Sequence, residues 1–142
     1  MKRTLITLLF LLCVIPIHAQ TDTPKIVLDG LAAYQKSGGK EAVSIWLKGS
    51  PIESDVSSRM SMSGGLVQFE TAYGKMIGFE PLRVASISPS VRLVYVLLKY
   101  EKGPVYGRFD CYKANSNWII PQLNLNVKAD TILPSDMLAG TR

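Results

Sequence analysis

The sequence predicts an α+β domain whose N-terminal helices pack on a curved antiparallel sheet. Three observations lead to this prediction. Apolar residues recur at helical spacing through the first half of the chain. The second half changes to segments rich in β-branched and aromatic residues, which are typical of strands. Short turns separate these segments, so we expect consecutive strands to pair antiparallel.

Residues 1–19 are predicted to be an export signal. The chain opens with the basic Lys2 and Arg3, continues with an almost unbroken apolar run over residues 5–17, and has the small Ala19 at the expected cleavage position. The run is shorter than the ~20 residues that a spanning helix needs, although a retained anchor is the alternative. We therefore expect an exported protein, periplasmic or secreted, without stable membrane insertion, whose single domain spans residues 20–142.

Composition excludes several classes of function. The formal net charge of +5 is mild and its charges are scattered, so no basic stripe predicts a nucleic-acid partner. The one histidine of the chain, His18, lies in the predicted signal. Its loss on cleavage excludes histidine-dependent nucleophiles and most zinc sites from the mature chain. We therefore expect no metal site and no cofactor.

A single cysteine, Cys111, follows the predicted signal, so an intramolecular disulfide is excluded. Free cysteines are among the most buried residue types. We expect Cys111 to be a small buried side chain in a strand; a reactive thiol or an intermolecular bridge is the alternative.

The first two helices are predicted from apolar spacing and glycine stops. The first ends at the glycines of residues 37–39, and the second spans residues 40–48 with Gly49 as its stop. Each helix carries an apolar stripe that we expect to face the sheet.

The third helix is predicted to begin with a capping box. Ser50 would cap it, Pro51 suits the first helical position, and Glu53 would complete the box. We expect a kink or break at the glycine pair of residues 64–65 and an end at Gly78.

The remaining segments are predicted strands and turns. We expect turns at residues 101–104 and 114–117. The tail from residue 128 to 142 is expected to be irregular, with residues 132–134 packing on the domain. The strands are expected over residues 83–88, 91–101, 105–113 and 118–127.

This order of elements over residues 25–127 resembles the nuclear transport factor 2-like superfamily, also called cystatin-like or SnoaL-like. Local features fit as well: Tyr73-Gly74 near the end of the last helix, Gly103-Pro104 in the hairpin, and Trp118 opening the last strand. The resemblance implies helices packed in the concave face of the sheet around a cone-shaped pocket. Its members include isomerases, dehydratases, ligand binders and accessory domains, so the fold does not select an activity.

Polarity sets the expected strand register. Placing Tyr100 opposite Val105 gives one apolar face under the helices, which includes Phe109 and Cys111, and a mixed outer face. Residues enriched at protein interfaces gather on that outer face, and the resemblance implies dimerisation there. A homodimer or partner interface is therefore expected, with a half-solvated outer face as the alternative. The interface candidates are Tyr95, Tyr106, Arg108, Asp110, Tyr112 and Trp118.

The same polarity assigns the faces of the last strand. On this strand we expect Trp118, Ile120, Gln122, Asn124 and Asn126 on the outer face, and Ile119, Pro121, Leu123 and Leu125 on the apolar face.

The expected function is non-catalytic binding or assembly. An isomerase or dehydratase that uses a carboxylate and a tyrosine is the alternative, with Asp110 and Tyr112, Glu70 or Glu80 as possible groups. No acid, base and oxyanion set converges in the sequence, so no catalytic residue is assigned. An apolar pocket for a small ligand is the second binding hypothesis, and a filled core is its alternative. The pocket candidates are Trp46, Phe69, Tyr73, Val96 and Phe109.

Overall fold

The computed structural model of this protein describes residues 22–140, so the predicted export signal lies outside the described residues. The helices are α1 (Lys25–Ser37), α2 (Gly39–Trp46), α3 (Val56–Tyr73), α4 (Ala129–Ile132) and α5 (Ser135–Leu138). The strands are β1 (Met76–Ser88), β2 (Val91–Tyr100), β3 (Gly103–Ala114) and β4 (Asn117–Asn126). The α+β class is confirmed, because three helices precede a four-stranded antiparallel meander in the order β1-β2-β3-β4.

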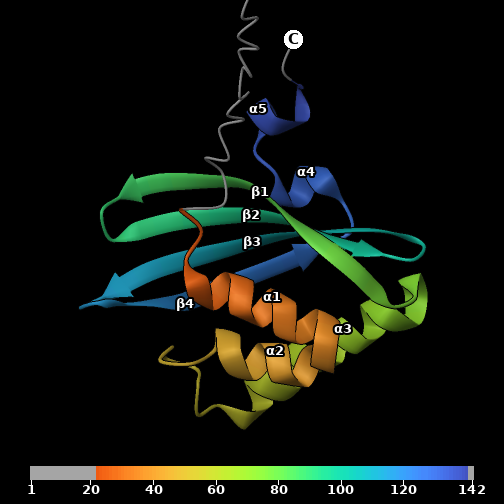
Figure 1. The fold of residues 1–142 in the computed structure, drawn as a ribbon, viewed down its shortest axis with the longest axis horizontal. Coiled ribbons are helices and arrows are strands. Elements are labelled where there is room, and N and C mark those ends of the chain that lie inside the picture. Colours follow the sequence, from red (N-terminus) through yellow and green to blue (C-terminus); the bar gives the residue numbers. More distant parts are fainter. Residues whose placement is uncertain (1–21, 141–142) are drawn as a thin grey trace, which may run out of the picture.

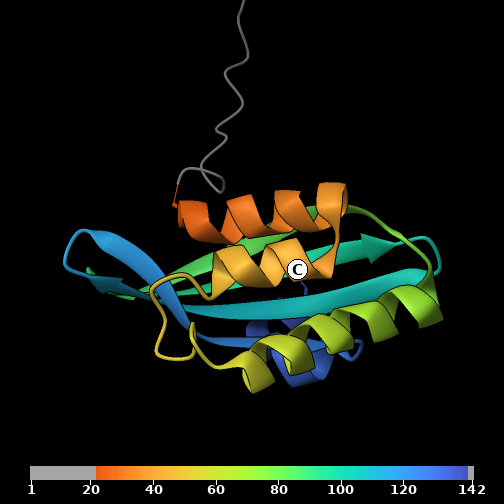
Figure 2. The same ribbon diagram turned by 90° about the horizontal axis from the view of Figure 1, so that it is seen from below.

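The helices and the sheet form layers. Figure 1 shows α1, α2 and α3 on one face of a curved, unclosed sheet, and the short helices α4 and α5 on the opposite face. Figure 2 looks onto the helical face, where α1 and α2 run side by side and α3 lies beyond α2. Within residues 22–140, no helix is long and apolar enough to cross a membrane.

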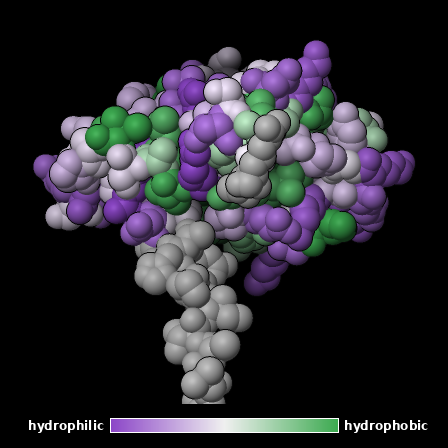
Figure 3. Space-filling model, turned by 90° about the horizontal axis from the view of Figure 1, so that it is seen from above, coloured by the Kyte–Doolittle hydropathy of each residue, from purple (hydrophilic) through white to green (hydrophobic). Residues whose placement is uncertain are grey.

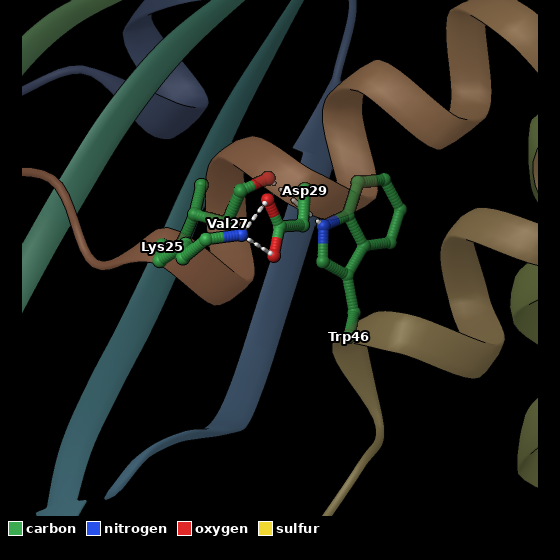
Figure 4. Close-up of polar contacts among 4 residues, drawn as sticks. All are labelled: Lys25, Val27, Asp29 and Trp46. Atoms are coloured by element: carbon green, nitrogen blue, oxygen red, sulfur yellow. Dashed lines mark hydrogen bonds and ion pairs between the residues drawn. The ribbon is translucent and has the colours of Figure 1, made fainter.

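The contact between α1 and α2 depends on Trp46. Its indole is fully buried, and its Nε1 donates a hydrogen bond of 3.3 Å to the carbonyl oxygen of Val27 on α1 (Figure 4). The same ring meets Phe109 of β3 edge to face, with centroids 5.2 Å apart. A side chain on Gly30 would place a Cβ only 2.0 Å from the indole nitrogen. Glycine at residue 30 therefore lets α1 approach the indole, and Trp46 ties both helices to the sheet.

The predicted start of α3 at Ser50 and Pro51 is wrong, because these residues form turns. The helix begins at Val56, and Asp55 caps it by accepting a hydrogen bond of 2.9 Å from the backbone nitrogen of Ser57. Glu53 accepts instead from the backbone nitrogen of Gly49, at 2.8 Å. An acceptor nearer to the helix therefore takes the capping role.

The predicted break in α3 and its predicted end at Gly78 are also wrong. The helix continues through the glycine pair and ends at Gly74, whose φ of 81° is left-handed. Gly78 belongs to β1, which is longer than the predicted strand over residues 83–88. Three register shifts interrupt the pairing of β1 with β2, and they hide the alternation that would have marked the strand.

The hairpin of β2 and β3 is tighter than predicted. Tyr100 pairs with Gly103, and Val105 pairs with Leu98 instead of Tyr100. The error is two residues, which is the side-chain period of a strand, so the two faces are as predicted. Phe109 lies in the core on the helical side, and Asp110 lies on the outer face.

The predicted faces of β4 hold only in its second half. Leu123 pairs with Phe109 as expected, but the register shifts between the pairings of Asp110 and Tyr112. Ile120 is consequently buried in the core and Trp118 packs against it, so their predicted place on the outer face is wrong. The shift falls at Pro121, which has no N–H to donate to the ladder and is tolerated at bulges.

The C-terminal tail forms two short helices where an irregular segment was predicted. Helix α4 packs on β3 and β4 through Ile132, which is buried as expected. Asp136 at the start of α5 forms an ion pair with Arg83 of β1. The Arg83 guanidinium lies 5.8 Å from the centre of the Tyr95 ring. The chain therefore covers part of its own outer face.

The Trp46 contact yields a stability prediction. Gly30→Ala is expected to lower the free energy of unfolding by about 1–3 kcal/mol, because the new methyl group cannot fit beside the indole. Gly64→Ala is the matched control: nothing lies within 4 Å of its added Cβ, so it should gain about 0.5–1 kcal/mol of helix propensity. Urea unfolding measures both changes. An unchanged midpoint for Gly30→Ala would contradict this account of the packing.

A candidate ligand cavity beneath helix α3

An apolar cavity lies between α2, α3 and β4. Its volume is about 230 Å³. The lining consists of hydrophobic side chains and one glycine: Val43, Trp46, Met62, Gly65, Leu66, Phe69, Leu123 and Leu125. No ionisable side chain is among them, so the cavity offers burial to an apolar group and no acid or base.

Helix α3 forms the loosely packed wall of this cavity. Its cavity residues recur at spacings of three and four, so they share one helical face. Leu66 is the one buried residue of the helix. Gly65 adds space, because nothing lies within 4 Å of a Cβ built there. A sequence with a larger residue at position 65 would fill part of this volume with its own side chain.

The sheet wall depends on the register of β4. Leu123 and Leu125 pair with Phe109 and Gly107, and they therefore lie on the helical face. Gly107 itself is tightly surrounded, since an added Cβ would lie 2.8 Å from Val96 and 2.9 Å from Leu125. The floor is consequently fixed, whereas the α3 wall has few contacts.

The structure brings together two of the five predicted pocket residues. Trp46 and Phe69 line the cavity. Val96 and Phe109 are fully buried in the core beneath it, and Tyr73 packs against Gly103 at the far end of α3. Gly65 is among the lining residues that were not predicted. The sequence analysis interpreted this glycine as a helix break, whereas in the structure it leaves open space beside the helix.

The carboxylates considered for catalysis do not converge on the cavity. Asp110 lies on the outer face, where its Oδ1 is 2.8 Å from the Nε of Arg108. Glu80 pairs with Lys99. The predicted register, with Tyr100 opposite Val105, also places Tyr95 opposite Asp110, and this is wrong because Tyr95 pairs with Arg108. Within residues 22–140, no group of three or more His, Cys, Asp or Glu could hold a metal ion.

A buried tyrosine pair was not predicted. The hydroxyl oxygens of Tyr34 and Tyr100 are 2.7 Å apart, and that of Tyr34 also donates to the Leu66 carbonyl at 3.3 Å. Burial raises the pKa of both hydroxyls, that of Tyr100 to about 12, and the negative charge of Glu70 acts in the same direction. Both phenols are therefore neutral at physiological pH. The pair joins α1, α3 and β2, so its geometry indicates a structural role.

The fold does not place the six predicted interface residues together on one exposed surface. Tyr95 is buried beneath Arg83, Tyr106 is half-buried, and Tyr112 is 46 % exposed. Trp118 lies on the helical side, where the Arg92 guanidinium is 4.9 Å from its ring centre. Figure 3 looks onto the outer face and shows hydrophobic and hydrophilic residues intermixed.

Comparisons with models of protein families, with curated proteins and with solved structures give no match to this chain. Its own geometry therefore carries the functional argument.

Cys111 yields a pH prediction. Burial raises the pKa of its thiol to about 12, so the unfolded chain loses this proton at lower pH than the folded one. The thiol should therefore make the free energy of unfolding decline as the pH rises from about 9 towards 12. Urea unfolding at several alkaline pH values should show a steeper decline for the wild type than for Cys111→Ala. Equal slopes would show that the thiol is not buried in the folded state.

Proposed function

We propose that this protein is an exported, non-catalytic binding domain of the nuclear transport factor 2-like type, which holds a small apolar ligand between α2, α3 and β4. The observation that carries the proposal is the cavity of about 230 Å³ lined by Val43, Trp46, Met62, Gly65, Leu66, Phe69, Leu123 and Leu125. A concave surface lined by apolar and aromatic side chains is typical of sites that bind small ligands. Filling it would remove apolar surface from water, which favours an apolar ligand.

The size of the cavity limits the ligand. An engineered apolar cavity of about 150 Å³ binds benzene. The larger volume here suits one or two rings, or a short aliphatic chain. Trp46 and Phe69 provide aromatic surface on two sides, so planar apolar groups and alkyl chains are both compatible with it.

The absence of ionisable groups from the lining favours binding over catalysis. General acid–base chemistry needs a proton donor or acceptor within hydrogen-bonding distance of the substrate. The lining offers no such side chain, and Asp110 is on the other face of the sheet. An isomerase or dehydratase working in this cavity would lack both of its polar partners.

Two further features support the proposed export and the proposed superfamily. Residues 1–19 carry the charge and apolar pattern of an export signal. The order of three helices and four meandering strands agrees with the superfamily that the sequence resembles. In that superfamily the pocket lies between the helices and the concave face, and this cavity lies between α2, α3 and β4.

Filling the cavity should abolish binding. Gly65→Leu places a side chain in the open space, so the fluorescence gain of the apolar probe N-phenyl-1-naphthylamine should be lost. Gly64→Leu is the matched control, since the neighbouring glycine is exposed and does not line the cavity. A fluorescence titration measures both variants beside the wild type.

Comparing Gly65→Leu with Gly64→Leu distinguishes binding in the cavity from binding elsewhere on the surface of α3. Both substitutions add the same side chain to adjacent helical positions and raise helix propensity equally. Equal probe binding by Gly65→Leu and Gly64→Leu would refute the cavity as the site, and no probe binding by the wild type would refute the function.

Assembly through the outer face is the second candidate, and the exposed Tyr112 favours it. Tyrosine is enriched in interface hot spots, and this side chain is 46 % exposed on the outer face. We expect sedimentation equilibrium to show self-association that Tyr112→Ser weakens and Gly65→Leu leaves unchanged. A monomer at high concentration would refute the homodimer.

A further inference from the structure

A groove lies where the start of α1, the end of α2 and the turn between β3 and β4 meet. Figure 2 shows this turn projecting past the first residues of α1. The groove has a volume of about 810 Å³, within the usual range for ligand pockets. None of its lining residues lines the cavity beneath α3, so the two are separate sites.

The aromatic side chain in the lining of this groove is Trp118. Its indole is half-buried, and the Arg92 guanidinium lies 4.9 Å from the ring centre. Arg92 does not line the groove, so it contacts the indole from outside. The exposed part of the indole therefore gives the groove a planar apolar surface, on which the C–H face of a sugar ring can pack.

The turn between β3 and β4 adds three small polar side chains, those of Asn115, Ser116 and Asn117, all of them exposed. Asn115 has a φ of 55°, a left-handed conformation that asparagine adopts more readily than most residues. An amide carries donors and an acceptor, and a serine hydroxyl can do either. Each of these side chains can therefore bond a ligand hydroxyl as donor or as acceptor.

The charged side chains of the groove nearly balance. Lys25 and Asp29 form an exposed ion pair of 2.6 Å on α1 (Figure 4), and Lys48 follows the end of α2. Exposed pairs contribute little stability, so ligand hydroxyls can exchange with this one at little cost. The groove thus offers donors and acceptors without a strong net charge.

We propose that this groove binds a neutral oligosaccharide, with one sugar ring packed on Trp118 and its hydroxyls bonded to the turn and to Asp29. A sugar ring presents both kinds of surface that suit this lining, a C–H face for the indole and hydroxyls that donate and accept. A purely apolar ligand would cover polar side chains and leave them unsatisfied. A polyanion would find two lysines, of which Asp29 already neutralises one.

The test titrates the full chain with three probes, which are cellotriose, maltotriose and triacetylchitotriose. The chain has two tryptophans and Trp46 is fully buried, so acrylamide quenching of the tryptophan emission reports on Trp118. At least one trisaccharide should bind saturably in calorimetry. The same trisaccharide should reduce the quenching, because its ring covers the indole.

Two variants locate the binding. Asn115→Gly removes the amide and keeps the turn, since glycine adopts a positive φ freely, and it should weaken binding about fivefold, the effect of one hydrogen bond. Trp118→Ala should weaken binding about tenfold or more. Gln68→Ala is the matched control, because it removes an exposed amide from α3, outside the groove, and should leave the affinity unchanged.

Three results would each overturn the proposal: no binding of any trisaccharide, unchanged quenching in the bound state, or full affinity in Trp118→Ala or Asn115→Gly. If Trp118→Ala does not fold, Asn115→Gly decides alone. Protection of Trp118 by tetra-alanine in place of the saccharides would also overturn it, by identifying a peptide groove. Gly65→Leu should leave saccharide binding unchanged, so the result is independent of the apolar ligand beneath α3.

Discussion

The rest of the structure depends on the seating of the Trp46 indole between α1, α2 and β3. A buried indole must satisfy its N–H, and the partner here is a helix carbonyl, that of Val27. That bond is available only because Gly30 leaves room beside the ring. The indole also packs on Phe109 of β3, so one side chain sets the separation of two helices and their position on the sheet. It also forms part of the cavity wall, so the cavity and the core share a residue.

Helix α3 contributes less to the core than α1 and α2 do. It buries Leu66 alone and exposes Val56, Met60 and Val67, whereas α1 and α2 bury several residues each. An element with few buried contacts can shift at low cost, and ligand-binding elements are commonly drawn from that class. The buried tyrosine pair contacts α3 through the carbonyl of Leu66 and through Phe69, whose ring centre is 6.4 Å from that of Tyr100. A ligand under α3 would supply apolar contacts that the chain itself does not provide.

Much of the fold was predictable because its signals are local. The change of period near the middle of the chain predicted helices before strands, and the stops at Gly38 and Gly49 placed α1 and α2 closely. The faces of β2 and β3 survived a register error of two residues because side chains alternate with that period. The start of α3 was missed because Ser50 offers as good a local cap as Asp55, and only the turns between them decide which is used.

The sequence by itself determined the α+β class, the apolar face of the central hairpin and the burial of Cys111. Each follows from composition or from a period that one segment carries alone. Tertiary structure decided the bulge at Pro121, the covering of the outer face by α4 and α5, and the cavity beneath α3. A cavity is the volume that several elements fail to fill together. The space beside Gly65 could therefore be identified only once α2, α3 and β4 were placed around it.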